Sequence, residues 1–460
     1  MKLFITKNIV IIPTIVCFIL GCSKGDLNLS PISSIGETSF YQDENQVQGG
    51  VIAIYDGIQE LPKTEFALTE MRSDNTRSRI GQGDIGEFEI YRIQPTNFYV
   101  SQYWKDNYNV VFRSNRVLGA LDVMQDENLR LQFEGEAKFA RALSHFNLSN
   151  AYGDVPILDK EVGFTDEDFI EYLAKDPVSD VLGFIISDLQ DAIELLPNRG
   201  STQEGRATKG AAKALLAKVF LTIGNYQSAV ILTRELLNDS NYSLVEDYSE
   251  IFYTEQNSEI IFAIPYIADD SSEGQGWGFE MTLACGTCYN FLADNFRNAV
   301  TIEDTERAAV LFNSSDDETI GKYLPNSSNI RLAGNDWIVL RLADVYLMHA
   351  EAIMAGTNAT SDSEAIDAYN AIRSRVGLQT LLTDGSATLT KEMLLYERRI
   401  ELAFENHRFY DLMRFGVAQE ILSLHASSEG NTFTETDLLN PIPQAEINIS
   451  EGLLEQNPGY

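Results

Sequence analysis

The sequence predicts a mainly α-helical protein that carries two long irregular segments and a few short strands. Several stretches of the 460-residue chain place apolar residues about three to four positions apart, which is typical of amphipathic helices. Glycine or proline ends most of these stretches. Two segments, at about 64–100 and 266–300, lack a sustained helical period and are rich in glycine and aromatic residues. Because long ordered loops often carry function, we expect these segments to bind the ligand.

The individual helices are predicted from their apolar stripes and their ends. Ser39 or Asp43 is a suitable N-cap for the first helix. Alanine-rich helices joined by a Gly-Asn turn, as at 224–225, resemble tetratricopeptide units, although the strict repeat of about 34 residues is absent. One short strand is expected at 259–264. We expect helices at 38–59, 104–124, 130–151, 177–196, 208–223, 226–237, 336–355 and 363–376.

The stretch at 396–416, YERRIELAFENHRFYDLMRFG, is predicted to join other helices together. It begins as an amphipathic helix, breaks at Asn406, and resumes as a second helix that ends at Gly416. Aromatic and charged side chains alternate through both halves. We therefore expect helices from earlier in the chain to dock against this hinge.

Three glutamates of this stretch admit two chemical interpretations. Glu397, Glu401 and Glu405 are four residues apart, so neighbouring Cβ atoms lie about 5–6 Å apart on a helix. Glycosidases use two carboxyl groups roughly 5–9.5 Å apart, so a catalytic pair is geometrically allowed. However, arginines surround these acids and lower carboxylate pKa values, whereas a general acid needs a raised pKa. We interpret the group as an ion-pair network and expect no enzymatic activity.

The N-terminus is typical of an exported lipoprotein. Two lysines precede an apolar run of 13 residues at 9–21, which is shorter than the roughly 20 residues of a membrane-spanning helix. We expect residues 1–21 to be a signal peptide. Ile-Leu-Gly-Cys at 19–22 resembles a bacterial lipobox, so Cys22 is the expected lipidation site. Residues 22–34 then form a polar tether, and 35–460 a single domain.

The formal net charge of −34 constrains the partners. Such a surface repels phosphate backbones, so we expect no nucleic acid partner. It favours neutral or basic ligands over polyanions.

Two further cysteines form the motif Cys285-Gly-Thr-Cys288. Zinc needs about four ligands, and the sequence offers no second CxxC motif or nearby histidine. Because disulfides persist outside the cytoplasm, we expect a small-loop disulfide, with free thiols as the alternative. We expect neither a metal nor a cofactor.

Several motifs together resemble the SusD/RagB family. The stretch ERRIELAFENHRFYDLMRFG resembles the C-terminal signature of that family, and other blocks occur in the expected order over nearly the whole chain. These blocks are WxxxY at 104–108, RSN at 113–115, GEAKFARALSHFNLSNAYGDVPIL, GRATKGAAKALLAKVFLTIGNY, RLADVYLMHAEAI, NAIRSRVGL and PIPQAEIN followed by EQNPGY.

The resemblance implies a SusD-like fold and a role in nutrient uptake. Members of the family are surface lipoproteins that capture nutrients for a TonB-dependent outer-membrane transporter in Bacteroidetes-type bacteria. We therefore expect a lipid-anchored protein of the outer membrane that binds an oligosaccharide or polysaccharide and passes it to a SusC-like transporter. The alternatives are the same scaffold binding oligopeptides, and a helical-repeat scaffold that binds only proteins.

Candidate ligand contacts come mainly from the two irregular segments. Neutral glycans are bound by aromatic faces combined with a few polar groups. Trp277 is the expected stacking platform, because glycines flank it on both sides. The second segment also offers Tyr289 and Asn290, and the first offers Asp74, Asn75 and Arg79. The resemblance adds Asp43, Asn45 and Arg373.

Overall fold

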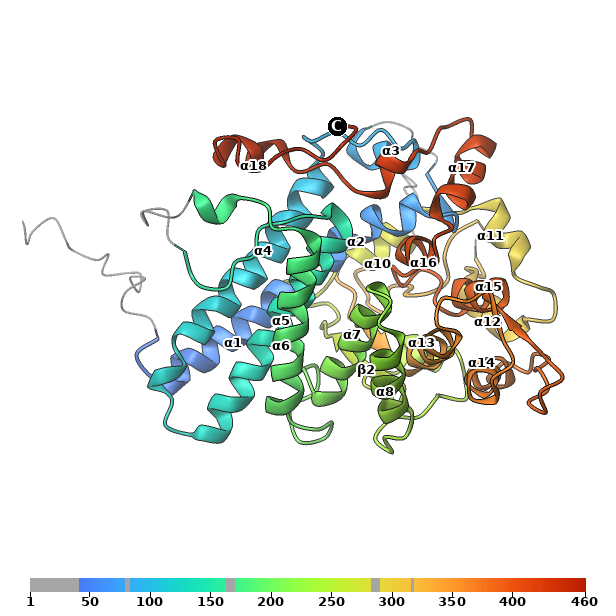
Figure 1. Ribbon diagram of the computed structural model, residues 1–460, viewed down its shortest axis with the longest axis horizontal. Helices are drawn as coiled ribbons and strands as arrows, with labels where there is room; N and C mark the ends of the chain where they lie inside the picture. Colours follow the sequence, from blue (N-terminus) through green and yellow to red (C-terminus); the bar gives the residue numbers. More distant parts are fainter. Residues whose placement is uncertain (1–40, 79–82, 163–169, 283–289, 316–317) are drawn as a thin grey trace, which may run out of the picture.

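A row of long helices, packed in chain order, forms the body of the molecule. The computed structural model describes residues 41–78, 83–162, 170–282, 290–315 and 318–460. Each helix of the row contacts the next one, as Figure 1 shows from left to right. The row comprises α1 (Glu44–Ile58), α4 (Phe98–Gly119), α5 (Glu127–Tyr152), α6 (Val178–Leu195), α7 (Lys209–Thr222), α8 (Tyr226–Leu237), α13 (Leu342–Met354) and α14 (Ser363–Arg375). The predicted mainly α-helical fold class with paired helices is therefore confirmed.

Side-chain caps explain where several helices begin. Asp43 caps α1 by accepting a hydrogen bond from the backbone N–H of Gln46. Asn97 caps α4, so that helix begins six residues before the predicted start at 104. The predicted helix at 226–237 matches α8 at both ends.

The predicted helix at 336–355 is wrong in its first part. Residues Trp337–Arg341 form strand β4, which pairs antiparallel with β2 (Ile260–Ile264), and α13 begins only at Leu342. The run of apolar residues suits either a strand or a buried helix, and the distant partner strand decides between them. The predicted strand at 259–264 is confirmed as β2.

The two segments predicted to be irregular contain short helices and strands instead. Helices of six or seven residues are too short for an apolar repeat to be visible in the sequence. The first segment holds α2 (Pro62–Leu68), η3 (Glu70–Arg72), β1 (Thr76–Arg77) and α3 (Gly83–Glu89). The second holds α10 (Trp277–Thr282), β3 (Phe291–Leu292) and α11 (Asp294–Ala299).

The C-terminal part includes α17 (Ala418–Ser428) and α18 (Gln444–Ile449), which lie along the upper edge of the row in Figure 1. Strands β5 (Ala359–Thr360) and β6 (Leu389–Thr390) pair antiparallel beside α14. The remaining elements are η4 (Leu121–Val123), η5 (Glu171–Leu173), α9 (Glu250–Tyr253), α12 (Thr305–Leu311), α15 (Lys391–Glu401), α16 (Arg408–Arg414) and η6 (Glu435–Leu438).

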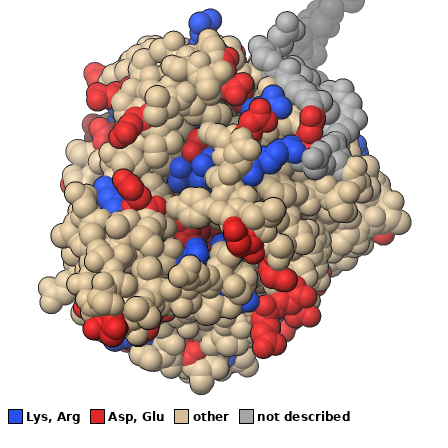
Figure 2. All heavy atoms as spheres, turned by 90° about the vertical axis from the view of Figure 1, so that its right-hand side faces the viewer, with Lys and Arg blue, Asp and Glu red and all other residues tan. Residues whose placement is uncertain are grey.

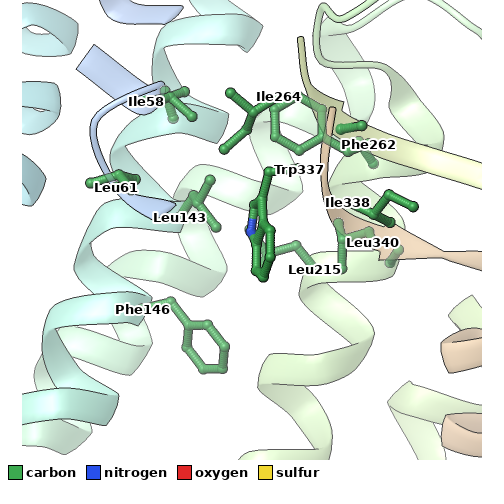
Figure 3. Close-up of a cluster of buried hydrophobic side chains, with 14 of the residues drawn as sticks. Ile58, Leu61, Leu143, Phe146, Leu215, Phe262, Ile264, Trp337, Ile338 and Leu340 are labelled. Atoms are coloured by element: carbon green, nitrogen blue, oxygen red, sulfur yellow. The ribbon is translucent and has the colours of Figure 1, made fainter. Parts of the chain in front are cut away.

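Two hydrophobic clusters meet at α13, which contributes buried residues to both. In the larger cluster, Trp337 of β4 lies among side chains of α5 and α7, including Leu143 and Leu215 (Figure 3). This arrangement joins the helical row to the β2–β4 pair. No helix among the described residues combines the length and the hydropathy needed to cross a membrane.

Candidate functional site

The hinge between α15 and α16 lies at the centre of the charged interior. Phe404 and Asn406 have positive φ angles of 63° and 62°, so the chain turns sharply between the two helices. Asparagine tolerates this left-handed conformation better than most residues. α15 ends at Glu401, so the helix stops earlier than the predicted break at Asn406, which lies in the turn before α16. The predicted end at Gly416, where φ is 69°, is confirmed.

The three glutamates of α15 and the hinge are buried and paired with cations. Each accepts bonds from at least two basic side chains at N–O distances between 2.5 and 2.8 Å. The bases come from four separate parts of the chain. The pairs are Glu397 with Arg307 and Arg373, Glu401 with Arg341 and Arg375, and Glu405 with Arg341 and Lys322.

These pairs set the charge of the buried glutamates. Burial alone would raise the pKa of Glu401, but Arg375, Arg341 and Arg307 together hold it well below its ordinary value. The pKa of Glu405 is lowered in the same way, because Arg341 and Lys322 outweigh its burial. The interpretation of this group as an ion-pair network is confirmed. A general acid would need the opposite shift.

Strands β1 and β3 bring the two predicted ligand-binding segments together. Thr76 lies opposite Leu292 and Arg77 opposite Phe291, and the N–H of Ala293 donates to the carbonyl of Asn75 over 2.9 Å. One residue separates β1 from residues 79–82, and one residue separates residues 283–289 from β3. The two segments thus meet at one place, although about 200 residues separate them along the chain.

Asp74 and Asn75 hold β1 onto the hinge and offer no open face to a ligand. Both are almost fully buried. Arg408 donates to both carboxylate oxygens of Asp74 over 2.7 and 3.0 Å, and Arg399 donates to the Asn75 amide oxygen over 2.9 Å. Burial alone would raise the pKa of Asp74, but Arg408 and Arg399 hold it well below its ordinary value. The expected ligand contact is therefore wrong for these two side chains, which serve to anchor β1.

Trp277 is not an exposed platform. Its side chain is only 3% exposed, and its ring packs edge-on against Tyr266, Tyr323 and Trp337 at centroid distances of 6.1, 5.3 and 5.0 Å. A Cβ atom at Gly278 would lie 3.1 Å from the carbonyl oxygen of Tyr323. The flanking glycine therefore permits close packing around the ring instead of leaving it open, and the predicted role is wrong.

The other predicted contacts are scattered. Asn290 is buried and donates to the carbonyl of Met281 over 3.3 Å, so its side chain is also turned inward. Asp43 caps α1, and Asn45 is exposed on the same helix. Arg373 lies at the edge of the ion-pair network, where it binds Glu397. Arg79, Tyr289, Cys22, Cys285 and Cys288 lie outside the described residues.

The edge of this network reaches the surface at Arg373. Figure 2 views the side of the molecule that carries α14 and α17, where Lys and Arg side chains line a hollow with Asp and Glu side chains beside them. Arg373 at this edge keeps 18% of its side chain exposed, whereas Glu397 behind it has none. A polar ligand can therefore reach Arg373 but not Glu397.

Two family models match separate parts of this chain. A model described as "SusD family" matches residues 303–460, and one described as "Starch-binding associating with outer membrane" matches residues 27–221. Together they cover most of the chain. The chain belongs to the SusD/RagB family.

Curated relatives and solved structures of the SusD/RagB family match almost the whole chain. SusD-like protein P2 of Formosa agariphila is 26% identical, and the alignment covers 100% of both chains. A SusD-like protein of Bacteroides ovatus is 21% identical, and the alignment covers 90% of this chain and 83% of that one. A solved structure named "Laminarin binding SusD-like protein" is 27% identical with a TM-score of 0.76, covering 91% of this chain and all of that one. Surface glycan-binding protein A from Bacteroides thetaiotaomicron, solved with laminarihexaose, shares the fold at 21% identity and a TM-score of 0.73, covering 90% and 99%.

One partly exposed aromatic ring of the second segment, Phe279, is not among the predicted contacts. The guanidinium of Arg331 lies 4.1 Å from the centre of the Phe279 ring, and it also pairs with Glu280 over 2.9 Å. Arg331 is 62% exposed. The sequence places Phe279 two residues after Trp277, so the aromatic content of the segment was visible. Which of the two rings faces solvent depends on the packing of α10.

Proposed function

We propose that this SusD/RagB protein binds an oligosaccharide or polysaccharide at the cell surface. The observation that carries the proposal is its likeness, along 91% of the chain, to a solved protein named for laminarin binding. A second protein of the same fold was solved with laminarihexaose, which supports the same class of ligand. We assign a binding role and no catalysis, because the closely spaced glutamates of α15 are occupied by arginines.

The proposed ligand surface is the place where β1 and β3 join the two segments. Tyr289 and Arg79 belong to the sequences that adjoin this pair and remain our proposed contacts. Phe279 and Arg331 add an aromatic side chain and an exposed hydrogen-bond donor from the second segment. Asp43, Asn45 and Arg373 remain secondary candidates because all three keep exposed surface.

The proposed route to the surface follows from the N-terminal sequence. Residues 1–21 are removed as a signal peptide, Cys22 is lipidated, and residues 22–34 tether a single domain at 35–460 to the outer membrane. Cys285 and Cys288 form a disulfide beside Tyr289. The bound glycan passes to a SusC-like TonB-dependent transporter, so the affinity must permit release. We expect a dissociation constant in the micromolar range or weaker, which corresponds to a binding free energy of about −8 kcal/mol or less in magnitude.

Affinity electrophoresis tests this function on the chain from Ser23 onward. Laminarin and a panel of other neutral and acidic polysaccharides are cast into native gels. We expect at least one neutral polysaccharide to retard the protein, and Tyr289→Ala to abolish that retardation because a stacking ring is lost. Phe112→Ala is the matched control, since Phe112 is an aromatic residue of α4 that is 39% exposed and lies outside both predicted ligand-binding segments.

The outcomes separate the function from the site. Retardation that survives Tyr289→Ala would keep the function and overturn the assignment of Tyr289. No retardation by any polysaccharide would overturn the function, and oligopeptides would then be tested on the same protein. Trp277→Ala is unsuitable here, because it would empty the centre of a buried aromatic cluster and test folding instead of binding.

A further inference from the structure

A cavity of about 270 Å³ lies between α5, α7, β4 and α16. One side of it is apolar and is formed by Leu143, Phe146, Leu215 and Trp337 (Figure 3). Its volume is just below the roughly 300–1,000 Å³ that is usual for drug-sized ligands. It can therefore hold only a small molecule, and an apolar body would fit against the aromatic rings.

The charged side chains around the cavity are almost all neutralised by partners. Lys218 pairs with Asp344 over 2.8 Å, and Arg414 pairs with Glu351 over 2.7 Å. Asp411 pairs with Arg398 and Arg414, and Glu405 with Arg341 and Lys322. His407 accepts a bond from Lys218 at 3.3 Å, and its pKa is lowered to about 4 by burial and by that lysine, so it is neutral at pH 7.

Glu65 is the exception among the described residues that line the cavity. It has no salt bridge to a basic side chain; Asn406 donates to one carboxylate oxygen over 3.0 Å and Tyr103 to the other over 3.4 Å. Burial raises its pKa to about 7, and the bonds from Asn406 and Tyr103 and the charge of Lys218 only partly oppose this. The Glu65 side chain nevertheless keeps some accessible surface, because the cavity lies beside it.

The groups around Glu65 come from three directions. Tyr103 approaches from α4, Asn406 and Tyr410 from the hinge and α16, and Lys218 from α7. Lys218 is the only cation among them, and Asp344 already holds its ammonium group. A positive charge in the cavity would therefore find a carboxylate that the protein itself has left without an ion pair.

We propose that this cavity binds a small organic molecule that carries a primary ammonium group, with Glu65 as its counter-ion and the Trp337 side of the cavity around its apolar body. The mouth of the cavity lies between α5, α7 and α16, where Asn150 and Thr222 keep exposed surface. The acidic surface of the whole chain also raises the local concentration of cations. This site is separate from the β1–β3 surface and does not depend on the proposed glycan function.

Benzylamine and benzyl alcohol are suitable probes, because they have nearly the same shape and differ in charge. Titration calorimetry at pH 8 should show binding of benzylamine and much weaker binding of benzyl alcohol. Glu65→Gln should weaken benzylamine binding about tenfold or more, the usual effect of removing a charged hydrogen-bond partner. Asp106→Asn is the control, since Asp106 also carries a partly buried carboxyl group but lies on α4, outside the cavity.

The pH dependence gives a second test. Because Glu65 must be ionised to bind an ammonium group, benzylamine binding should weaken about tenfold between pH 8 and pH 6 in the unchanged protein. The Glu65→Gln variant should show no such dependence. An unchanged melting temperature at pH 6 would show that this variant is folded.

Three results would overturn the proposal: no benzylamine binding at millimolar concentration, equal binding of benzyl alcohol, or unchanged binding in Glu65→Gln. If benzylamine binds as expected, glucosamine and phenylalanine amide then distinguish an amino-sugar source from a peptide source. Tyr289→Ala should leave benzylamine binding unchanged, so failure of the glycan function and failure of this site can be told apart.

Discussion

Glu401 and Glu65 both lie inside the protein, yet their environments drive their charges in opposite directions. Glu401 lies among three arginines, and its pKa falls well below the ordinary value. Glu65 meets only an amide and a phenol at hydrogen-bond distance, and its pKa rises to about 7. Burial is therefore a poor guide to the charge of a carboxyl group here, whereas the presence of a guanidinium decides it.

This difference divides the interior into two functional regions. The network around α15 is closed, because each carboxylate already has its cations and any ligand would have to displace one. The cavity beside Glu65 has an apolar side and one carboxyl without an ion pair. The first region holds distant parts of the chain together, and the second is available for a ligand.

Removing the central arginine should produce the largest effect. Arg341 donates to Glu259, Glu401 and Glu405. We expect Arg341→Met to lower the free energy of unfolding by about 3–5 kcal/mol, because breaking a buried network leaves charges without partners. Urea unfolding followed by circular dichroism measures this loss as a shift of the midpoint at constant slope.

Arg331→Met provides the matched control for that experiment. The Arg331 side chain, which pairs with Glu280, is 62% exposed, so the expected loss of unfolding free energy is below about 1 kcal/mol. Equal losses in the two variants would contradict the view that the buried network stabilises the hinge more than a surface pair does.

The closed network could be predicted from the sequence, whereas the cavity could not. Glutamates four residues apart among arginines already indicated ion pairs, and the long amphipathic helices indicated the row. The role of Glu65, by contrast, depends on the packing of α2, α7 and α16 against one another, which no local sequence pattern predicts. In the same way, β4 depended on a partner strand more than 70 residues away.

The error at Trp277 has a different physical cause. A tryptophan between two glycines has room on both sides, and that room admits either solvent and a ligand or the close approach of other rings. In this protein Tyr323 and Trp337 fill it. The local sequence is the same in both cases, so only the tertiary packing of α10 separates a platform from a core residue.

Two buried carboxyls with the same direction of pKa shift should respond differently to neutralisation. Glu65 and Glu70 each have a pKa of about 7 against an ordinary value of 4.5. Their protonated forms stabilise the fold fully below pH 4.5, and that stability is lost as the pH rises through 7. Each therefore costs roughly 3 kcal/mol at pH 8.

Glu65→Gln should recover most of that loss at pH 8 and almost none at pH 4.5, because a Gln amide can accept from Asn406 and donate to Tyr103. Glu70→Gln should not recover this loss, since both carboxylate oxygens of Glu70 accept hydrogen bonds. One accepts from the backbone N–H of Asn406 and the other from the side-chain amide of Asn75. One end of the new amide would then face a donor. Urea midpoints at both pH values measure the difference, and equal gains in the two variants would contradict it.

The smallest expected effect lies at the edge of the closed network. Arg373 donates to Glu397 over 2.8 Å, but Arg307 donates to the same carboxylate over 2.6 Å and would remain. We expect Arg373→Met to cost only about 1–2 kcal/mol, well below the loss for Arg341→Met. Urea unfolding measures this under the same conditions.

The same variant also tests the proposed secondary role of Arg373 at the surface. Native gels with the retarding polysaccharide show whether binding weakens while the fold is retained. Weakened retardation with a small loss of stability would assign Arg373 to the ligand as well as to Glu397. A loss of stability as large as that of Arg341→Met would instead show that Arg307 cannot compensate, and that the network depends on each of its arginines, including those at its edge.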